Sequence, residues 1–159
     1  MAKKIVIVLL VLGLVFYFRG CFAGMPAVMP ADFKLEFSTG GGMLDRSSNL
    51  HLSAQGGTLE KRYDGTETKI EFTVSPDELN ALYQVLRKYS FPRIRTNGSE
   101  IHDKGGYAVS AHWDDSHYSV GTSGTDISFF WRRQWDNIVA CLSEYQRKIE
   151  QQKNAESLH

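Results

Sequence analysis

A chain of 159 residues, 42% of them hydrophobic, is long enough for one compact domain and short for two. Its 18 basic and 18 acidic residues cancel to a formal charge of zero, so the molecule has no overall field to attract a polyanion. This neutrality argues against nucleic acid as a partner.

The first element is an apolar run from Ile5 to Phe18, preceded by Lys3 and Lys4. Its length is that of a signal-peptide core and is below the roughly 20 apolar residues of a full membrane span. The paired lysines favour a cytoplasmic N-terminus, so the rest of the chain is expected across the membrane. We therefore predict a membrane-anchored protein of the bacterial cell envelope or periplasm, with residues 1–21 as an export signal or anchor.

Cys21 follows this run and is a candidate site of lipid attachment. The Gly20-Cys21 pair resembles the lipobox of bacterial lipoproteins, in which the cysteine becomes the lipidated first residue, whereas Phe18 and Arg19 depart from that pattern. Three outcomes stay open: a lipid anchor at Cys21, an uncleaved apolar anchor, and cleavage with release of the domain.

Residues 22–32 are predicted to form an extended tether, because Pro26 and Pro30 interrupt a stretch without periodicity. The other cysteine, Cys141, lies in a predicted helix and is interpreted as a small buried side chain. No Cys-x-x-Cys or Cys-His spacing suggests a disulfide or zinc site. No metal or other cofactor is therefore expected.

The domain opens with alternating apolar and polar residues, which predict half-buried strands. The first strand ends at Gly40, Gly41 and Gly42, which suit a wide turn and would also allow close approach of a partner's backbone. Alternation resumes afterwards and continues on both sides of Asp64-Gly65, a dipeptide typical of tight hairpin turns. The first half is therefore predicted to be an antiparallel meander.

The sequence SPDE at 75–78 combines a capping serine, a proline at the first helical position and a glutamate three residues after the cap. It predicts a helix from Pro76 to Tyr89 with an apolar face on the sheet. A basic and aromatic cluster, RKYSFPRIR at 87–95, follows. Such clusters can bind single-stranded nucleic acid, but neutrality and export favour a solvated helix end or a surface facing anionic lipid.

The stretch EIHDKGG, residues 100–106, places His102 beside Asp103 at the entrance of the next predicted strand. A catalytic site would use Asp103 to orient His102 as a base, and a metal site would gather both with His112 and His117. No nucleophile motif such as Gly-x-Ser-x-Gly is present, and the spacing matches no recognised metal site. The favoured interpretation is structural: the aspartate satisfies backbone amides and the glycines adopt positive φ.

His112 and His117 flank the turn of a second predicted hairpin. The last element is a helix whose apolar residues recur at helical spacing as far as Ile149, followed by a polar tail at 150–159. Aromatic residues at its start, including Phe129 and Phe130, could mark a binding surface, although core packing is the favoured interpretation.

Together these elements predict an α+β domain over residues 33–149. An antiparallel sheet of about five strands, in two hairpin or meander groups, would be covered on one face by two amphipathic helices. The order resembles that of small exported bacterial domains. It is also similar to emfourin-type inhibitors of thermolysin-like proteases, in a strand ending in glycines (KLEFSTGGGM), a helix, a strand pair and a final helix. That resemblance implies protease inhibition as one function and carries over no inhibitory residue.

The sequence favours a membrane-tethered, extracytoplasmic binding module without enzymatic activity, whose partner is an envelope protein or another envelope component. The residues predicted to form an interaction surface are Gly40, Gly41, Gly42, His102, Asp103, His112 and His117. Two alternatives stay open. One is a secreted or tethered inhibitor of thermolysin-like metalloproteases, and the other is a small metal-dependent enzyme using His102 and Asp103.

Overall fold

The computed structural model describes residues 24–40, 46–98 and 105–156. The elements in these ranges are β1 (Lys34–Gly40), β2 (Arg46–Ser53), β3 (Gly56–Tyr63), β4 (Thr66–Phe72), α2 (Pro76–Lys88), η1 (Phe91–Arg93), β5 (Gly106–Trp113), β6 (Ser116–Gly121), η2 (Phe129–Trp131) and α3 (Arg132–Glu156). Here η1 and η2 are short 3-10 turns. Five residues singled out from the sequence, Cys21, Gly41, Gly42, His102 and Asp103, lie outside the described residues.

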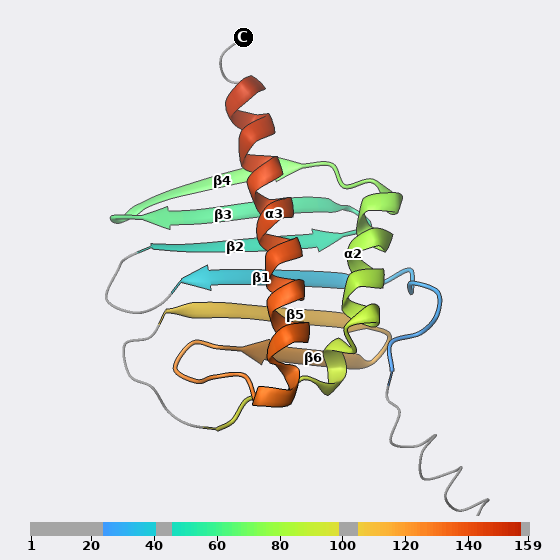
Figure 1. Ribbon diagram of the computed structural model, residues 1–159. Helices are drawn as coiled ribbons and strands as arrows, with labels where there is room; N and C mark the ends of the chain where they lie inside the picture. Colours follow the sequence, from blue (N-terminus) through green and yellow to red (C-terminus); the bar gives the residue numbers. More distant parts are fainter. Residues whose placement is uncertain (1–23, 41–45, 99–104, 157–159) are drawn as a thin grey trace, which may run out of the picture.

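The strands form one six-stranded antiparallel sheet in the order β4-β3-β2-β1-β5-β6. Strand β1 pairs with β2 on one side and with β5 on the other, so it joins the meander β1–β4 to the hairpin β5–β6. Both helices cross the same face of the sheet (Figure 1). The predicted α+β class is confirmed, with six strands in a single sheet.

Alternation along the strands gives the sheet two unlike faces. The face under the helices is apolar, and its buried strand residues include Leu35, Phe37, Leu50, Leu52, Leu59, Val109, Ala111 and Trp113. The helices add Leu79, Leu82, Tyr83 and Leu86 from α2 and Trp135, Ile138, Leu142 and Ile149 from α3. These side chains form one core, which orients every strand because the remaining positions must point the other way.

Helix α2 begins where its capping sequence predicts. The Ser75 hydroxyl accepts a hydrogen bond from the Glu78 amide at 3.2 Å, and the Glu78 carboxylate accepts one from the Ser75 amide at 2.9 Å. Hydrogen bonds from the Ser75 side chain, and then from its backbone, lower the pKa of Glu78. This reciprocal capping box satisfies amides that the first turn of a helix leaves without partners.

Helix α3 continues to Glu156, into the segment predicted as a polar tail. Pairs within the helix accompany this extension: Gln146 donates to Glu150 at 2.9 Å, and Lys153 lies 2.7 Å from Glu156. Cys141 is partly buried on this helix, and burial raises the pKa of its thiol. In the part of the chain that the structure describes, no helix is both long and apolar enough to cross a membrane.

Gly106 is required for a different reason from the predicted one. Its φ does not lie in the left-handed region, so the expected positive φ is wrong for this residue. A Cβ atom at this position would lie 2.6 Å from the Ser123 amide nitrogen and 2.6 Å from the Thr122 carbonyl carbon. The Thr122 amide also donates to the Tyr107 carbonyl at 2.8 Å. Close passage of a distant backbone segment, rather than local conformation, therefore excludes a side chain.

The chain before β1 lies against α2 and the core. Met25 is 6% exposed and belongs to the core. The Tyr83 hydroxyl on α2 donates to the Pro26 carbonyl at 2.7 Å, and the Phe33 amide donates to the Pro30 carbonyl at 3.2 Å. Most of the predicted tether, residues 25–32, is thus held against the domain and does not form a free linker.

Candidate functional site

The face of the sheet opposite the helices is the candidate functional surface, and we call it the open face. It consists of every second strand residue, such as Lys34, Glu36 and Ser38 on β1, with their register partners on the neighbouring strands. No helix of the described residues covers this face (Figure 1). It is polar in all six strands, as expected for a sheet that packs on one side only.

A row of polar side chains crosses the middle of the open face. Glu36 lies between His51 on β2 and Ser110 on β5 in the strand register. His51 Nδ1 is 3.5 Å from Glu36 Oε1, and the Ser110 hydroxyl is 2.9 Å from the Ser119 hydroxyl on β6. Both members of the His51–Glu36 pair are nearly half exposed, so solvent screening leaves this pair weak.

This row does not have the order that nucleophilic catalysis needs. In a serine hydrolase the imidazole lies between the hydroxyl and the carboxylate, so that it can take the hydroxyl proton. Here the Glu36 carboxylate occupies the middle position. His51 and Ser110 stand two strands apart, which corresponds to about 10 Å at the usual strand spacing. The imidazole therefore cannot act as a base towards Ser110.

His112 and His117 are brought together near the β5–β6 turn. They are direct register partners, and their rings stack with centroids 4.1 Å apart and planes 7° apart. Within residues 24–40, 46–98 and 105–156, no group of three or more His, Cys, Asp or Glu residues could hold a metal ion. A typical catalytic zinc site has three protein ligands, so the imidazoles of His112 and His117 do not form such a site by themselves.

The predicted interaction surface is divided between two ends of β5. Gly40 pairs with Gly106, which precedes His112 by six residues, about 20 Å along an extended strand. Gly40 has a φ of 139°, and a Cβ atom there would lie 2.8 Å from the Arg46 carbonyl oxygen. The protein's own backbone therefore accounts for this glycine, as the turn interpretation expects.

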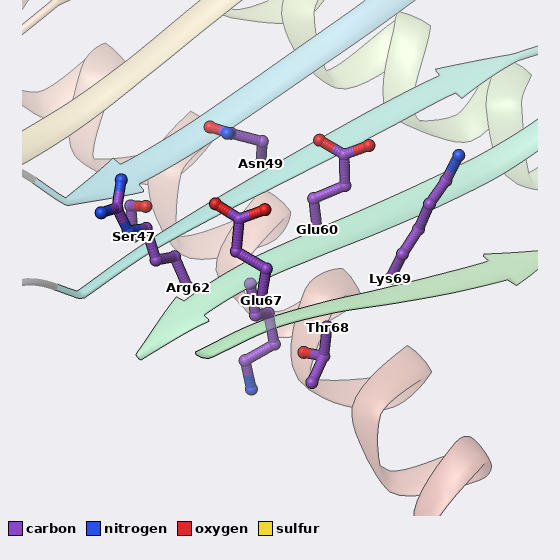
Figure 2. A pocket seen from close by; sticks show the side chains of 8 residues that line it. Ser47, Asn49, Glu60, Arg62, Glu67, Thr68 and Lys69 are labelled. Atoms are coloured by element: carbon purple, nitrogen blue, oxygen red, sulfur yellow. The ribbon is translucent and has the colours of Figure 1, made fainter. Parts of the chain in front are cut away.

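The structure adds a hollow that was not singled out from the sequence. It lies on the open face across β2, β3 and β4, has a volume of about 370 Å³, and is shown in Figure 2. The open-face side chains that line it are Ser47, Asn49, Glu60, Arg62, Glu67 and Lys69. We call these six residues the mixed-charge hollow.

Charges in the mixed-charge hollow alternate in two directions. Glu60 pairs with Lys69 in the register of β3 and β4, and Arg62 pairs with Glu67 in the next open-face row. Figure 2 shows these four side chains projecting from the same two strands. The signal was present in the sequence, because charges at every second residue on both arms of a hairpin predict cross-strand charge pairs. Because acidic and basic side chains alternate in the mixed-charge hollow, this surface can bind ligand groups of either charge.

Comparison of the sequence with models of known protein families and with curated proteins finds no match. The features that bear on function are the apolar N-terminal segment, the open face and the mixed-charge hollow.

Proposed function

We propose that the protein is a membrane-tethered, extracytoplasmic binding module without enzymatic activity, and that it binds its partner at the mixed-charge hollow. The apolar run with its flanking lysines supports the tether. The binding role is inferred from one observation. Acidic and basic side chains alternate around a hollow on the open face, namely Glu60, Arg62, Glu67 and Lys69.

The charge pattern supports an envelope protein, bound through a segment that carries both signs, as the partner. Such a segment can place a cation beside Glu60 or Glu67 and a carboxylate beside Arg62 or Lys69, and complementary charges give specificity more than raw affinity. The two glutamates offset Arg62 and Lys69, so these four residues give a polyanion no net attraction.

Protease inhibition and a metal-dependent reaction at His102 and Asp103 remain predictions. Titration of a thermolysin-like enzyme with the purified protein tests the first. Loss of bound metal or of an activity in His102→Ala tests the second.

The binding role is tested by photo-crosslinking in the native envelope. A photoreactive residue replaces Asn49 in the hollow, and in a control replaces Glu144, an exposed residue of α3. We expect a discrete protein adduct from position 49 alone. Equal adducts from both positions would contradict a binding surface on the open face.

Exchanging the charges of Glu60 and Lys69 tests whether the hollow itself binds the partner. The double variant Glu60→Lys/Lys69→Glu keeps an opposite-charge pair across β3 and β4 while reversing what a partner meets. We expect the adduct from position 49 to fall about tenfold or more, since like charges placed against a partner cost several kcal/mol. Thermal melting checks that the double variant is folded. An undiminished adduct in the folded double variant would overturn the mixed-charge hollow as the site.

A further inference from the structure

We infer that a second surface of the domain, away from the mixed-charge hollow, rests on the anionic surface of the membrane. It combines the exposed side chains of Phe129 and Phe130 with six basic residues, Arg87, Lys88, Arg93, Arg95, Arg132 and Arg133. We call this surface the aromatic-basic end. The inference rests on the tether of the proposed function and adds the orientation in which the tethered domain is held.

Two adjacent phenylalanines point into solvent at η2. Phe129 is 79% exposed and Phe130 is 84% exposed, and their rings pack edge to face with centroids 5.9 Å apart. By contrast, Trp135 in the first turns of α3 is 3% exposed. Contiguous exposed apolar side chains are typical of surfaces that contact a partner or a membrane. Phenylalanine side chains of this kind insert at the boundary between headgroups and acyl chains.

Basic residues from two separate segments surround this pair. The Ser128 amide donates to the Arg95 carbonyl at 2.9 Å, and the Arg93 guanidinium lies 5.9 Å from the centre of the Trp131 ring. These contacts hold the 3-10 turns η1 and η2 side by side. The Arg93–Arg95 stretch of the basic cluster therefore lies beside the turn that carries the aromatic pair, and Arg87 and Lys88 precede it at the end of α2.

The charge of this surface departs from that of the whole chain. Segments 87–97 and 125–136 contain six basic residues and two acidic ones, Asp126 and Asp136, although the whole chain is neutral. All six basic side chains are exposed. Clustered exposed lysine and arginine residues are attracted to anionic lipid headgroups, and adjacent aromatic residues add apolar contact. This charge complementarity favours a lipid surface over a neutral protein partner.

The length of the chain before the domain brings this surface to the membrane. The apolar run ends at Phe18 and the chain is fixed to the core from Met25. The intervening residues 19–24 span at most about 25 Å even when fully extended. An anchor at Cys21 would leave a shorter connection still. The domain is therefore held close to the bilayer and cannot move far from it.

The point where the chain joins the domain decides which end meets the bilayer. In Figure 1 the described chain begins at the lower end of the domain, where η1, η2 and β6 also lie. The C-terminal end of α3 and strand β4 lie at the opposite end. The aromatic-basic end therefore faces the membrane, and the mixed-charge hollow on β2–β4 is carried away from it.

The test uses the full-length protein reconstituted into phosphatidylcholine vesicles with or without phosphatidylglycerol. A photoreactive phenylalanine analogue replaces Phe130, and in a matched control replaces Tyr63, an aromatic residue 53% exposed at the β3–β4 turn. We expect a covalent phospholipid adduct from position 130 that is about tenfold stronger than from position 63 in vesicles containing phosphatidylglycerol. Omission of phosphatidylglycerol should weaken it.

Charge reversal gives the second arm. Arg132→Glu/Arg133→Glu should reduce the adduct from position 130 about tenfold, whereas Arg147→Glu/Lys148→Glu, further along α3, should not change it. Equal adducts from positions 130 and 63 in protein that floats with the vesicles would overturn the docked orientation and leave the tether intact. A protein adduct at position 130 in place of lipid would also overturn it. Failure of the protein to float at all would overturn the tether, and the inference with it.

Discussion

At the scale of single residues, two glycines are needed for different physical reasons. Gly65 follows Asp64 in a turn where both residues have positive φ, so local conformation selects it. Gly106 has no such conformation and instead lies under the backbone of Thr122 and Ser123. Its replacement acts through crowding, which is a property of the folded chain.

Gly106→Ala is expected to lower the free energy of unfolding by about 1–3 kcal/mol, because the added methyl group overlaps backbone atoms that cannot rotate away. Gly121→Ala on the neighbouring strand is the matched control, since its nearest atom would lie at 3.5 Å, an ordinary contact. Urea denaturation of the two purified variants measures the difference. Equal destabilisation would show that the Thr122 segment yields to the methyl group.

At the scale of elements, the start of α2 is determined by four consecutive residues, 75–78. The side-chain directions in η2 are not determined by such a local signal. The aromatic residues 129–131 were expected to pack in the core, but η2 is a 3-10 turn in which successive side chains lie about 120° apart. Phe129 and Phe130 are consequently directed away from the core.

Ser75→Ala should destabilise the protein by about 0.5–2 kcal/mol at neutral pH, because the first turn of α2 loses its side-chain cap. Ser128→Ala is the control, since Ser128 precedes η2 without a side-chain cap bond. Denaturant midpoints of the two variants give the comparison.

The contribution of Glu78 to this cap depends on pH. Because its folded-state pKa is lowered, the stabilisation is complete above the pKa of a free glutamate and is lost as the pH falls through the folded-state value. The stability difference between the natural protein and Ser75→Ala should therefore narrow in acid. A difference that widens in acid would contradict the charged capping box.

At the scale of the whole molecule, we propose two surfaces with different roles: one contacts the membrane and the other binds the partner. The aromatic-basic end lies at the end where the described chain begins, and the mixed-charge hollow lies on the strands furthest from it in the sheet order. Helix α3 spans the sheet between them (Figure 1). Under these two proposals, the open face would be directed parallel to the membrane plane, where we expect the partner to bind.

Native protein is expected to fractionate with membranes, with the domain accessible to protease from the outer side of the cytoplasmic membrane. The reason is the apolar run from Ile5 to Phe18 with Lys3 and Lys4 before it. Incorporation of labelled palmitate that disappears in Cys21→Ser would identify a lipid anchor, and membrane retention of unlabelled protein would identify an uncleaved one. A main pool of soluble cytoplasmic protein would contradict export.

Short-range chemistry in the sequence determined the elements. Alternation predicted the strands, Asp64-Gly65 predicted a hairpin turn, and the capping residues at 75–78 predicted the start of α2, because each signal acts within one turn or one strand. These signals also determined the α+β class, since strands with one apolar face and two amphipathic helices have few ways to bury that face.

Only the tertiary structure decided which of these elements meet. Glu36 and Ser110 are separated by more than seventy residues in the sequence and become neighbours because β1 pairs with β5. No local pattern specifies that pairing. The same holds for the backbone that crowds Gly106 and for Arg93 of η1, which lies beside Trp131 of η2. The alternating charges of β3 and β4 can be read from the sequence, whereas the hollow depends on the pairing of β2, β3 and β4 in the sheet. Strand order depends on burial summed over the whole core, and that sum is not a property of any single segment.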